Sequence, residues 1–276
     1  MIAQPRSSQR YEGRKADRDR PLLERMIELS RANPRYGYRR VWAMLRREDW
    51  QVNKKRVHRL WRREGLKVPD KQRKRRRLAK LEGTSENGCT RRRAESRNHV
   101  WSYDFVMDET EEGRRLKMMP IVDEYSRECL SIEVERSITA EDVVETLASL
   151  FCRRGEPEFI RSDNGPEFIA KAIKRWLEVS GVGTLYIEPG SPWENAYSET
   201  FISRFGDELL KREMFADLLE AKVLVEDYRG HYNHHRPHSA LGYRTPAEFA
   251  VAAELLDRKV EDAGRAEELE SVLTLS

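Results

Sequence analysis

The chain has 276 residues, of which 38% are hydrophobic and 36% charged, so it can form one large or two ordinary domains beneath a very polar surface. No apolar run approaches the roughly 18 residues of a membrane-spanning helix, and the Arg-rich N-terminus lacks the apolar segment of a secretory signal. Three cysteines without a close pair argue against a disulfide scaffold or a Cys-rich zinc site, and the absence of a Gly-rich phosphate-binding motif argues against an ATP-driven step.

Charge is distributed unevenly along the sequence. The first 97 residues hold 31 Lys and Arg against 12 Asp and Glu, a net charge of +19, whereas the remainder has a net charge of −15. Such asymmetry is typical of a basic nucleic-acid-binding module joined to an acidic one. The alternative is a basic surface that is merely solvated, and the size of the difference disfavours it.

Three short helices are expected in the basic part, after a flexible lead over residues 1–19. The first begins near Pro21 and ends before Asn33, because proline favours the first turn of a helix and disfavours helix at the residue preceding it. The second covers about Tyr38–Arg47. The third follows Asn53, whose side chain can cap a helix.

The last of these helices has a basic outer face, which is typical of a helix-turn-helix module that inserts its last helix into the major groove of DNA. The alternative is a small helical bundle with solvated charges. We place the module at residues 20–66 and a basic linker, which touches phosphates without reading sequence, at residues 67–97. The predicted DNA contacts are Arg39, Arg40, Lys54, Lys55, Arg56, Arg59, Arg73, Arg75 and Arg76.

From Val100 onward the pattern is that of strands. Alternation in "VWSYDFVM" predicts one strand that contains Asp104, followed by a hairpin turn near Gly113 and the strands "LKMMPIVDE" and "CLSIEVE". Helices then alternate with the strands "PEFIRS" and "TLYIE", and the capping box at Ser191 and Glu194 begins a long helix. This order predicts a mixed α/β sheet flanked by helices over residues 98–250. A helix is expected over Leu209–Tyr232, with Leu218, Leu219, Val223 and Val225 partly in the core, and an acidic tail over residues 251–276.

Three carboxylates in this half lie on rigid elements and could converge. Asp104 lies in the first strand, Asp163 at the carboxyl end of the fourth, where open α/β sheets bind ligands, and Glu199 in the capped helix. Convergence requires cations to cancel the repulsion, and Mg²⁺ prefers carboxylate and phosphate oxygens. Two such ions can activate an attacking oxygen and stabilise a leaving one in phosphodiester displacement.

Each carboxylate also has a structural alternative. Asp163 precedes Asn-Gly and could be only a turn residue, and Glu199 could be an ordinary exposed helical glutamate. Asp104, on an otherwise apolar strand, is harder to dismiss because a buried carboxylate without a partner is costly. Asp123, at another strand end, is interpreted as a turn residue or a support of the site.

The chain resembles the second-reading-frame catalytic proteins of insertion-sequence-three transposases, which are relatives of retroviral integrases. The resemblance extends from Tyr36 to Phe249, and its stretches are "YGYRRVWAMLRREDWQVNKKRVHRLWRREGL", "WSYDFVMDETEEGRRLKMMPIVDEYSREC", "RSDNGPEF", "SPWENAYSETFISRF" and "YNHHRPHSALGYRTPAEF". It implies a ribonuclease-H-like mixed sheet flanked by helices, preceded by an all-α helix-turn-helix domain.

The same resemblance implies that Asp104, Asp163 and Glu199 are the catalytic residues and hold two Mg²⁺ or Mn²⁺ ions. Asn164 and Gly165 would shape the turn beside the second aspartate. The implied reaction is cleavage at the ends of the element, followed by attack of the freed 3′-hydroxyls on target DNA, without a covalent enzyme–DNA intermediate.

The implied partners are DNA, both element ends and target, and the first-reading-frame protein of the same element, carried as a fusion. The protein would be cytoplasmic and nucleoid-associated, without a membrane, and a homo-oligomer on DNA. The first-frame protein supplies a leucine zipper in this family, and the present chain has no sustained apolar heptad. We therefore expect it to bind element ends poorly without the fusion.

One position departs from the family pattern. In related integrases and transposases a basic residue often follows the glutamate by seven positions, and here that position is Gly206. The nearest basic residue, Arg204, points about 160° away from it around a helix. This favours the alternative of a catalytically silent DNA-binding regulator of element ends, whereas the complete triad favours activity. A nuclease that cuts without joining is a third reading, for which the helix-turn-helix module would be superfluous.

Four histidines lie in "HYNHHRPH", at His231, His234, His235 and His238. Their spacing is not a common zinc pattern and no cysteine is near, so zinc binding is the less favoured reading. We interpret the segment as a structural turn, or as DNA contacts made by Arg236 and His235.

Overall fold

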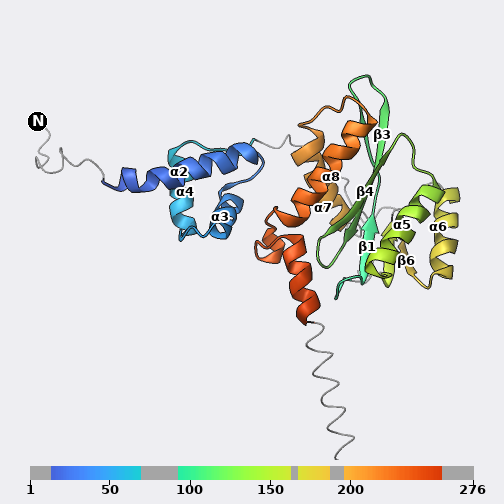
Figure 1. Ribbon diagram of the computed structural model, residues 1–276. Helices are drawn as coiled ribbons and strands as arrows, with labels where there is room; N and C mark the ends of the chain where they lie inside the picture. The colour runs from blue at the N-terminus through green and yellow to red at the C-terminus, as the bar shows by residue number, and fades with distance from the viewer. Residues whose placement is uncertain (1–13, 70–92, 163–166, 187–195, 257–276) are drawn as a thin grey trace, which may run out of the picture. The chain divides into compact units, whose positions relative to one another are not determined.

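A computed structural model describes residues 14–69, 93–162, 167–186 and 196–256 (Figure 1). The chain divides into two compact units, Met1–Leu81 and Glu82–Ser276, and each buries its own apolar core. Within the described ranges, no helix combines the length and the apolar character needed to span a membrane.

The first unit packs three helices around one core. They are α2 (Arg14–Ala32), α3 (Tyr38–Arg47) and α4 (Lys54–Arg63). The bounds of α3 are those expected from the sequence. The start of α4 is also as expected, because the side chain of Asn53 accepts a hydrogen bond from the backbone N–H of Lys55 at 2.8 Å. The core includes Leu22, Met26, Leu29, Val41, Leu45, Val57, Leu60 and Trp61.

The start of α2 differs from the expectation, because the helix begins at Arg14 and has Pro21 in its interior. The expected flexible lead is therefore partly helical, although an interior proline removes a backbone hydrogen bond. A tertiary contact holds this part of the helix: buried Asp19 accepts two hydrogen bonds from the guanidinium of Arg56 on α4, at 2.9 and 2.5 Å. No local sequence pattern predicts that contact.

The second unit contains a six-stranded mixed sheet with helices on both faces. Its strands are β1 (Val100–Tyr103), β2 (Val106–Glu109), β3 (Arg115–Asp123), β4 (Cys129–Glu135), β5 (Phe159–Ser162) and β6 (Gly183–Tyr186). Its helices are α5 (Ala140–Arg154), α6 (Glu167–Val179), α7 (Ala196–Phe205) and α8 (Leu218–His234), with a π-helical turn at Gly206–Leu210, a 3₁₀ turn at Ser239–Leu241 and a helix over residues 246–256. The mixed α/β fold class and the preceding all-α region are confirmed.

The strand β3 is paired along both edges. One edge pairs antiparallel with β4, and the other pairs antiparallel first with β2 and then with β1. On its far side β1 pairs in parallel with β5, and β5 with β6. Across the sheet the order is therefore β4, then β3, then β1 and β2 at one position, then β5 and finally β6.

The strands β1 and β2 form one strand that is interrupted at Asp104 and Phe105, where the sequence predicts no break. The side chain of Asp104 accepts a hydrogen bond from the backbone N–H of Phe105 at 2.7 Å. Such a local bond competes with the sheet ladder for the backbone group. Asp104 therefore lies at the carboxyl end of β1 instead of within the strand.

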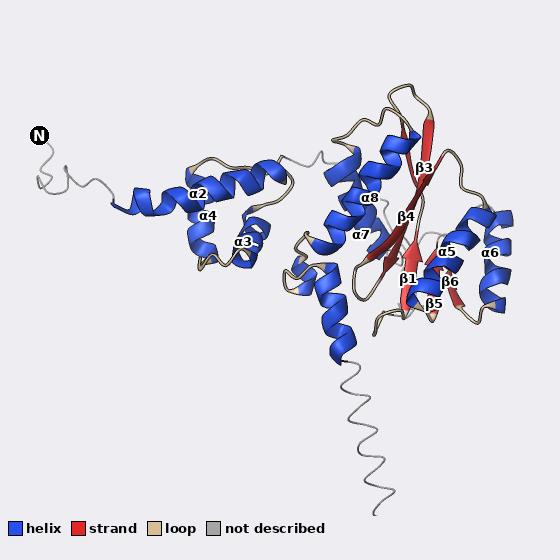
Figure 2. Ribbon diagram, in the orientation of Figure 1, coloured by secondary structure: helices blue, strands red, loops and turns tan. Residues whose placement is uncertain are grey.

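Two pairs of helices cover the two faces of the sheet (Figure 2). On one face, Trp101 of β1 belongs to the core that includes Leu147 of α5 and residues of α6. On the other face, Val122 of β3 shares a core with Phe201 of α7 and Val225 of α8. The sheet thus separates two apolar cores.

The helix expected over Leu209–Tyr232 begins only at Leu218. The chain before it leaves the helical path, because Phe215 pairs with Thr110 beside the β2–β3 hairpin. Leu219 and Val223, expected to be partly in the core, are 71% and 60% exposed. Val225 is buried and Leu218 packs against the core, as expected, and the buried face of α8 also includes Ala221, Tyr228, Tyr232 and Asn233.

The second unit also begins before Asn98, the expected boundary. Ala94 and His99 are buried, and Arg97 forms an ion pair with Glu254 at 2.6 Å. The last residues of the expected linker therefore pack with the second unit, and residues 70–92 lie outside the described residues.

Candidate active site and nucleic-acid interface

Asp104 is half-buried at the carboxyl end of β1. Side chains alternate along a strand, and Trp101 and Tyr103 enter the core beneath α5 and α6. Ser102 therefore faces the opposite side, where α7 and α8 pack. Asp104 comes two residues after Ser102, at the break in the strand, where its carboxylate remains accessible from solvent.

Glu199 is exposed in the first turn of α7. The helix packs against β1 and β3, and Phe201 anchors it in the core. Ser198 of α7 and Ser102 of β1 are both buried, and their hydroxyls lack hydrogen-bond partners among the described residues. Small side chains on the two elements permit a close approach between the Glu199 helix and the strand that leads to Asp104.

The second predicted aspartate, Asp163, lies outside the described residues, as do Asn164 and Gly165. In the chain it follows β5, the parallel neighbour of β1. Ser102 and Arg161 are paired across these two strands, and each precedes a predicted aspartate by two residues. In sequence, both aspartates thus follow the carboxyl ends of adjacent parallel strands.

The donor set suits a hard divalent cation, because carboxylate oxygens are preferred by Mg²⁺. Asp104 and Glu199 are both accessible from solvent, as a site that a DNA phosphate enters requires. In the part of the chain that the structure describes, no group of three His, Cys, Asp or Glu is arranged to hold a metal ion. The predicted third ligand, Asp163, lies outside the described residues.

Asp123 is a turn residue in this structure. Its buried carboxylate accepts hydrogen bonds from the backbone N–H groups of Asn98, Tyr125 and Ser126, at 2.9, 3.0 and 2.7 Å, and from the Ser126 hydroxyl at 2.9 Å. Burial raises its pKa, while these hydrogen bonds oppose the rise. The carboxylate closes the turn after β3 and ties it to the residues preceding β1.

A buried ion pair that the sequence did not reveal joins β5 to the turn after β3. The guanidinium of Arg161 on β5 donates to the carboxylate of Glu124 at 2.9 Å, and both side chains are buried. The backbone N–H of Glu124 donates to the carbonyl of Val100 at 3.0 Å. The sequence signal for this pair is the polar residue Arg161 within the short strand "FIRS". Its partner is distant in the sequence, so the pair itself was not predictable.

In the first unit, the predicted DNA contacts differ in their surroundings. On α4, Lys54, Lys55 and Arg59 are exposed, whereas Arg56 is half-buried against Asp19. On α3, Arg39 is exposed and Arg40 lies over the Tyr36 ring at 5.2 Å. Arg73, Arg75 and Arg76 lie outside the described residues.

Comparison with known proteins identifies both units. Models described as "Integrase core domain" match residues 94–192 and 180–246, and one described as "HTH-like domain" matches residues 16–76. The transposase InsD of insertion element IS2A/D/F/H/I/K from Escherichia coli is 29% identical over 84% of this chain and 78% of its own length. An uncharacterized 31.7 kDa protein of insertion element IS407 from Burkholderia multivorans is 36% identical over 91% of this chain and 88% of its own length. The chain belongs to the insertion-sequence-three family of transposases.

The second unit of this transposase has the ribonuclease-H-like fold of an integrase core. Its likeness to a solved structure, the HTLV-2 integrase catalytic core domain in complex with magnesium, is weaker. It has a TM-score of 0.45 and 15% identity over 57% of this chain and 99% of that one. A likeness of this size does not bear on function.

Position 206 of this transposase is a glycine and not a basic residue, and the structure shows no packing reason for the glycine. Gly206 opens the π-helical turn, and its carbonyl accepts a hydrogen bond from the backbone N–H of Lys211 at 3.0 Å. A Cβ atom at this position would meet no described atom within 4 Å. A longer side chain is therefore sterically compatible with the turn.

Residues of the His-rich segment "HYNHHRPH" make structural contacts within the second unit. Asn233 exchanges two hydrogen bonds with the backbone of Cys129, at 2.9 and 2.8 Å. Arg236, which was considered as a DNA contact, is 1% exposed and bound to Glu208, so the structural alternative holds for this residue. His235 is exposed.

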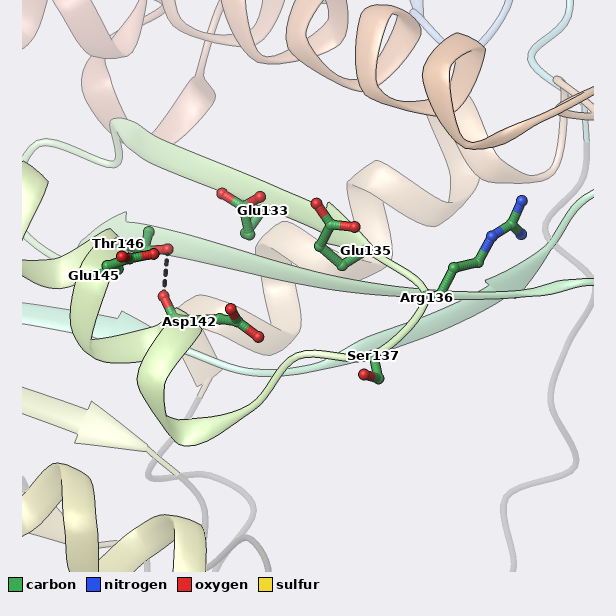
Figure 3. Close-up of a pocket in the computed structure, with 7 residues that line it drawn as sticks. All are labelled: Glu133, Glu135, Arg136, Ser137, Asp142, Glu145 and Thr146. Carbon is green, nitrogen blue, oxygen red and sulfur yellow. Dashed lines mark hydrogen bonds between the residues drawn. The ribbon is translucent and has the colours of Figure 1, made fainter.

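A cavity of about 410 Å³ lies between β4 and α5, and neither Asp104 nor Glu199 lines it (Figure 3). Four of its lining residues are the acids Glu133, Glu135, Asp142 and Glu145. Burial raises the pKa of Glu133, and Glu135 is paired with Lys222 of α8. This acidic lining disfavours a phosphate, so the cavity does not suit the DNA backbone.

Proposed function

We propose that this transposase cleaves the ends of its element and joins the freed 3′-hydroxyls to target DNA, with Asp104, Asp163 and Glu199 as its divalent-metal ligands. The proposal is supported above all by the parallel pairing of β1 with β5 and the packing of α7 on β1. Continuation of that register beyond Ser102 and Arg161 would put the two aspartates side by side. Glu199 would then approach from the helix that covers the same strand.

The three side chains would act by holding two Mg²⁺ or Mn²⁺ ions in a fixed geometry. When bound, such ions supply charge stabilisation for both the attacking and the leaving oxygen of a phosphodiester. Asp104 and Glu199 are attached to elements with buried anchors, Trp101 and Phe201, which limits their movement. No serine or tyrosine nucleophile is required for this displacement.

We propose that DNA is bound through the first unit. The exposed basic residues of α4 fit a helix that enters the major groove. In addition, the first turns of α3 and α4 contain no acidic residue, so no carboxylate there offsets the positive ends of the two helix dipoles, which favour phosphates. A first-reading-frame partner, supplied as a fusion, and a homo-oligomer on DNA belong to the same proposal.

The test is a strand-transfer assay. The protein, as a fusion with its first-frame partner, is mixed with Mg²⁺ and a labelled DNA that carries the element end. The variants Asp104→Asn, Asp163→Asn and Glu199→Gln are compared with wild type, and Asp108→Asn, a carboxylate on neighbouring β2, is the control. Joined product is expected from the wild type and the control and from none of the three variants, with end-DNA binding retained in all.

Two other outcomes would redirect the assignment. Loss of product in only one or two of the three variants would remove the remaining carboxylate from the ligand set. Tight end binding without cleavage by the wild type would support the silent regulator, which the absence of a basic side chain at Gly206 favours. In that case Gly206→Lys, with Gly206→Ala as its control, is the next comparison.

A further inference from the structure

An ion pair at the end of the Glu199 helix has no part in the chemistry proposed above. The guanidinium of Arg236 donates two hydrogen bonds to the carboxylate of Glu208, both at 2.7 Å. Both side chains are buried, with 2% and 9% of their surface exposed. Glu208 lies in the π-helical turn that continues α7, and Arg236 follows α8. The pair thus connects the Glu199 helix to the segment after α8.

Aromatic rings make several of the other contacts of α7, beside apolar side chains such as Ile202. Phe201 packs against Tyr232 with ring centroids 4.8 Å apart, and Phe205 against Tyr228 at 5.2 Å. At the start of the helix, the Arg127 guanidinium lies 3.6 Å from the centroid of the Tyr197 ring. Ring contacts tolerate small rotations and shifts of a helix. A bidentate arginine–carboxylate pair does not, because both hydrogen bonds must stay aligned.

Stability alone does not account for a pair of this kind. Replacing a buried ion pair by apolar residues of similar volume is often neutral or stabilising, because two charges no longer have to be desolvated. The pair also lies on a π-helical turn, an element that is rare and frequently found at functional sites. The pair therefore contributes more to the orientation of the helix than to the stability of the fold.

We propose that the Glu208–Arg236 pair fixes the rotation of α7 and thereby the direction in which Glu199 presents its carboxylate. Both are positioning residues, and neither touches DNA or metal. The inference rests on the proposed role of Glu199 as a metal ligand. It assigns a task to the arginine of the His-rich segment and to the π-helical turn.

The deciding variant replaces both partners by apolar residues, Glu208→Leu with Arg236→Met, in the full chain fused to its first-frame partner. This double variant keeps the volume and removes the directed contact without leaving a buried charge unpaired. Three quantities are measured: the thermal midpoint, Mn²⁺ binding followed by the paramagnetic resonance signal of the free ion, and strand transfer as a function of Mg²⁺. Glu199→Gln provides the reference for loss of the ligand itself.

We expect the double variant to keep a thermal midpoint close to that of wild type, to bind Mn²⁺ more weakly and to lose roughly 100-fold in strand transfer, the effect of a small misplacement of a reacting group. Wild-type Mn²⁺ binding and strand transfer in the folded double variant would overturn the inference. If the double variant does not fold, the same two readouts on Glu208→Gln decide. Should wild type bind Mn²⁺ through Glu199 and yet join no DNA, the proposed function fails, while the Mn²⁺ comparison still tests the pair.

Discussion

Lys55 and Arg56 are neighbours on α4, but they have different surroundings. Lys55 is exposed, whereas Arg56 donates two hydrogen bonds to buried Asp19 of α2. The first side chain is available to a phosphate, and the second holds the helices of the first unit together. One basic face in the sequence therefore contains residues with separate tasks.

This difference predicts different effects of Lys55→Ala and Arg56→Ala. Lys55→Ala should leave stability unchanged and reduce by about 1 the slope of log affinity for end DNA against log salt concentration, because one phosphate contact is lost. Arg56→Ala should cost roughly 1–3 kcal/mol of stability, because it leaves the carboxylate of Asp19 without its main partner. Fluorescence titrations at several salt concentrations, with thermal unfolding, check both. Equal salt slopes for the two variants would contradict the division of tasks.

At the scale of single residues, local signals were predictable and distant partners were not. Asn53 as the cap of α4 follows from the residue itself and its neighbours. The pairs Asp19–Arg56, Glu124–Arg161 and Glu208–Arg236 join positions that are 37, 37 and 28 residues apart, and no short-range pattern encodes them. For the candidate site, the sequence predicted the strand that ends just before Asp163, whereas it placed Asp104 within a strand and did not reveal the break there.

The helix α5 begins with a reciprocal N-terminal cap. The hydroxyl of Thr139 accepts a hydrogen bond from the backbone N–H of Asp142 at 3.3 Å, and the carboxylate of Asp142 accepts one from the backbone N–H of Thr139 at 2.7 Å. This reciprocal pair satisfies two backbone groups that a helix start leaves without partners. It fixes the start of the helix that covers Trp101 of β1.

We expect Thr139→Ala to cost about 1 kcal/mol and to lower the thermal midpoint by roughly 2–4 °C. Ser137→Ala, a change at an exposed serine nearby, is the matched control and should have no effect.

The hydrogen bonds from the backbone and hydroxyl of Thr139 lower the pKa of Asp142. The stability from this carboxylate is therefore present above about pH 4, the unfolded pKa, and is lost as pH falls through the lower folded value. Thermal unfolding between pH 3 and 6 that shows the same pH dependence for wild type and Asp142→Asn would contradict this.

The helix bounds illustrate what periodicity can predict at this scale. The helix was predicted over about Tyr38–Arg47, the bounds that the structure has, because an amphipathic pattern and a turn coincide there. The start of α8 was wrong because Phe215 leaves the helical path to pair with Thr110, which is a tertiary effect. The helix start expected at Ser191 lies outside the described residues, so it stays a prediction.

At the scale of the whole molecule, the order of strands follows from chain topology, and β3 is the strand with the most extensive pairing. It is bonded to β4 on one edge and to β2 and β1 on the other. By contrast, β6 has four residues and pairs only with β5 in the described sheet. The sheet is therefore expected to be unequally resistant to local opening.

Native-state hydrogen exchange should reveal that gradient. The backbone amides of Met118 and Ile121 in β3 are expected to exchange only on global unfolding, whereas those of Thr184 and Leu185 in β6 should exchange through smaller local openings. Exchange measured against low concentrations of denaturant separates these two classes. Uniform opening energies across the sheet would show that the strands form a single cooperative unit.

The interrupted strand gives this gradient a consequence for the proposed site. Asp104 follows β1, which is bonded directly to β3, whereas Asp163 follows β5, which joins β3 only through β1. The two aspartates would therefore belong to parts of the sheet with different opening energies. A fluctuation that frees β5 and β6 would separate the ligands while the rest of the core stays folded. Such a state would be folded and inert, and its population would be set by the outer strands rather than by the predicted ligands.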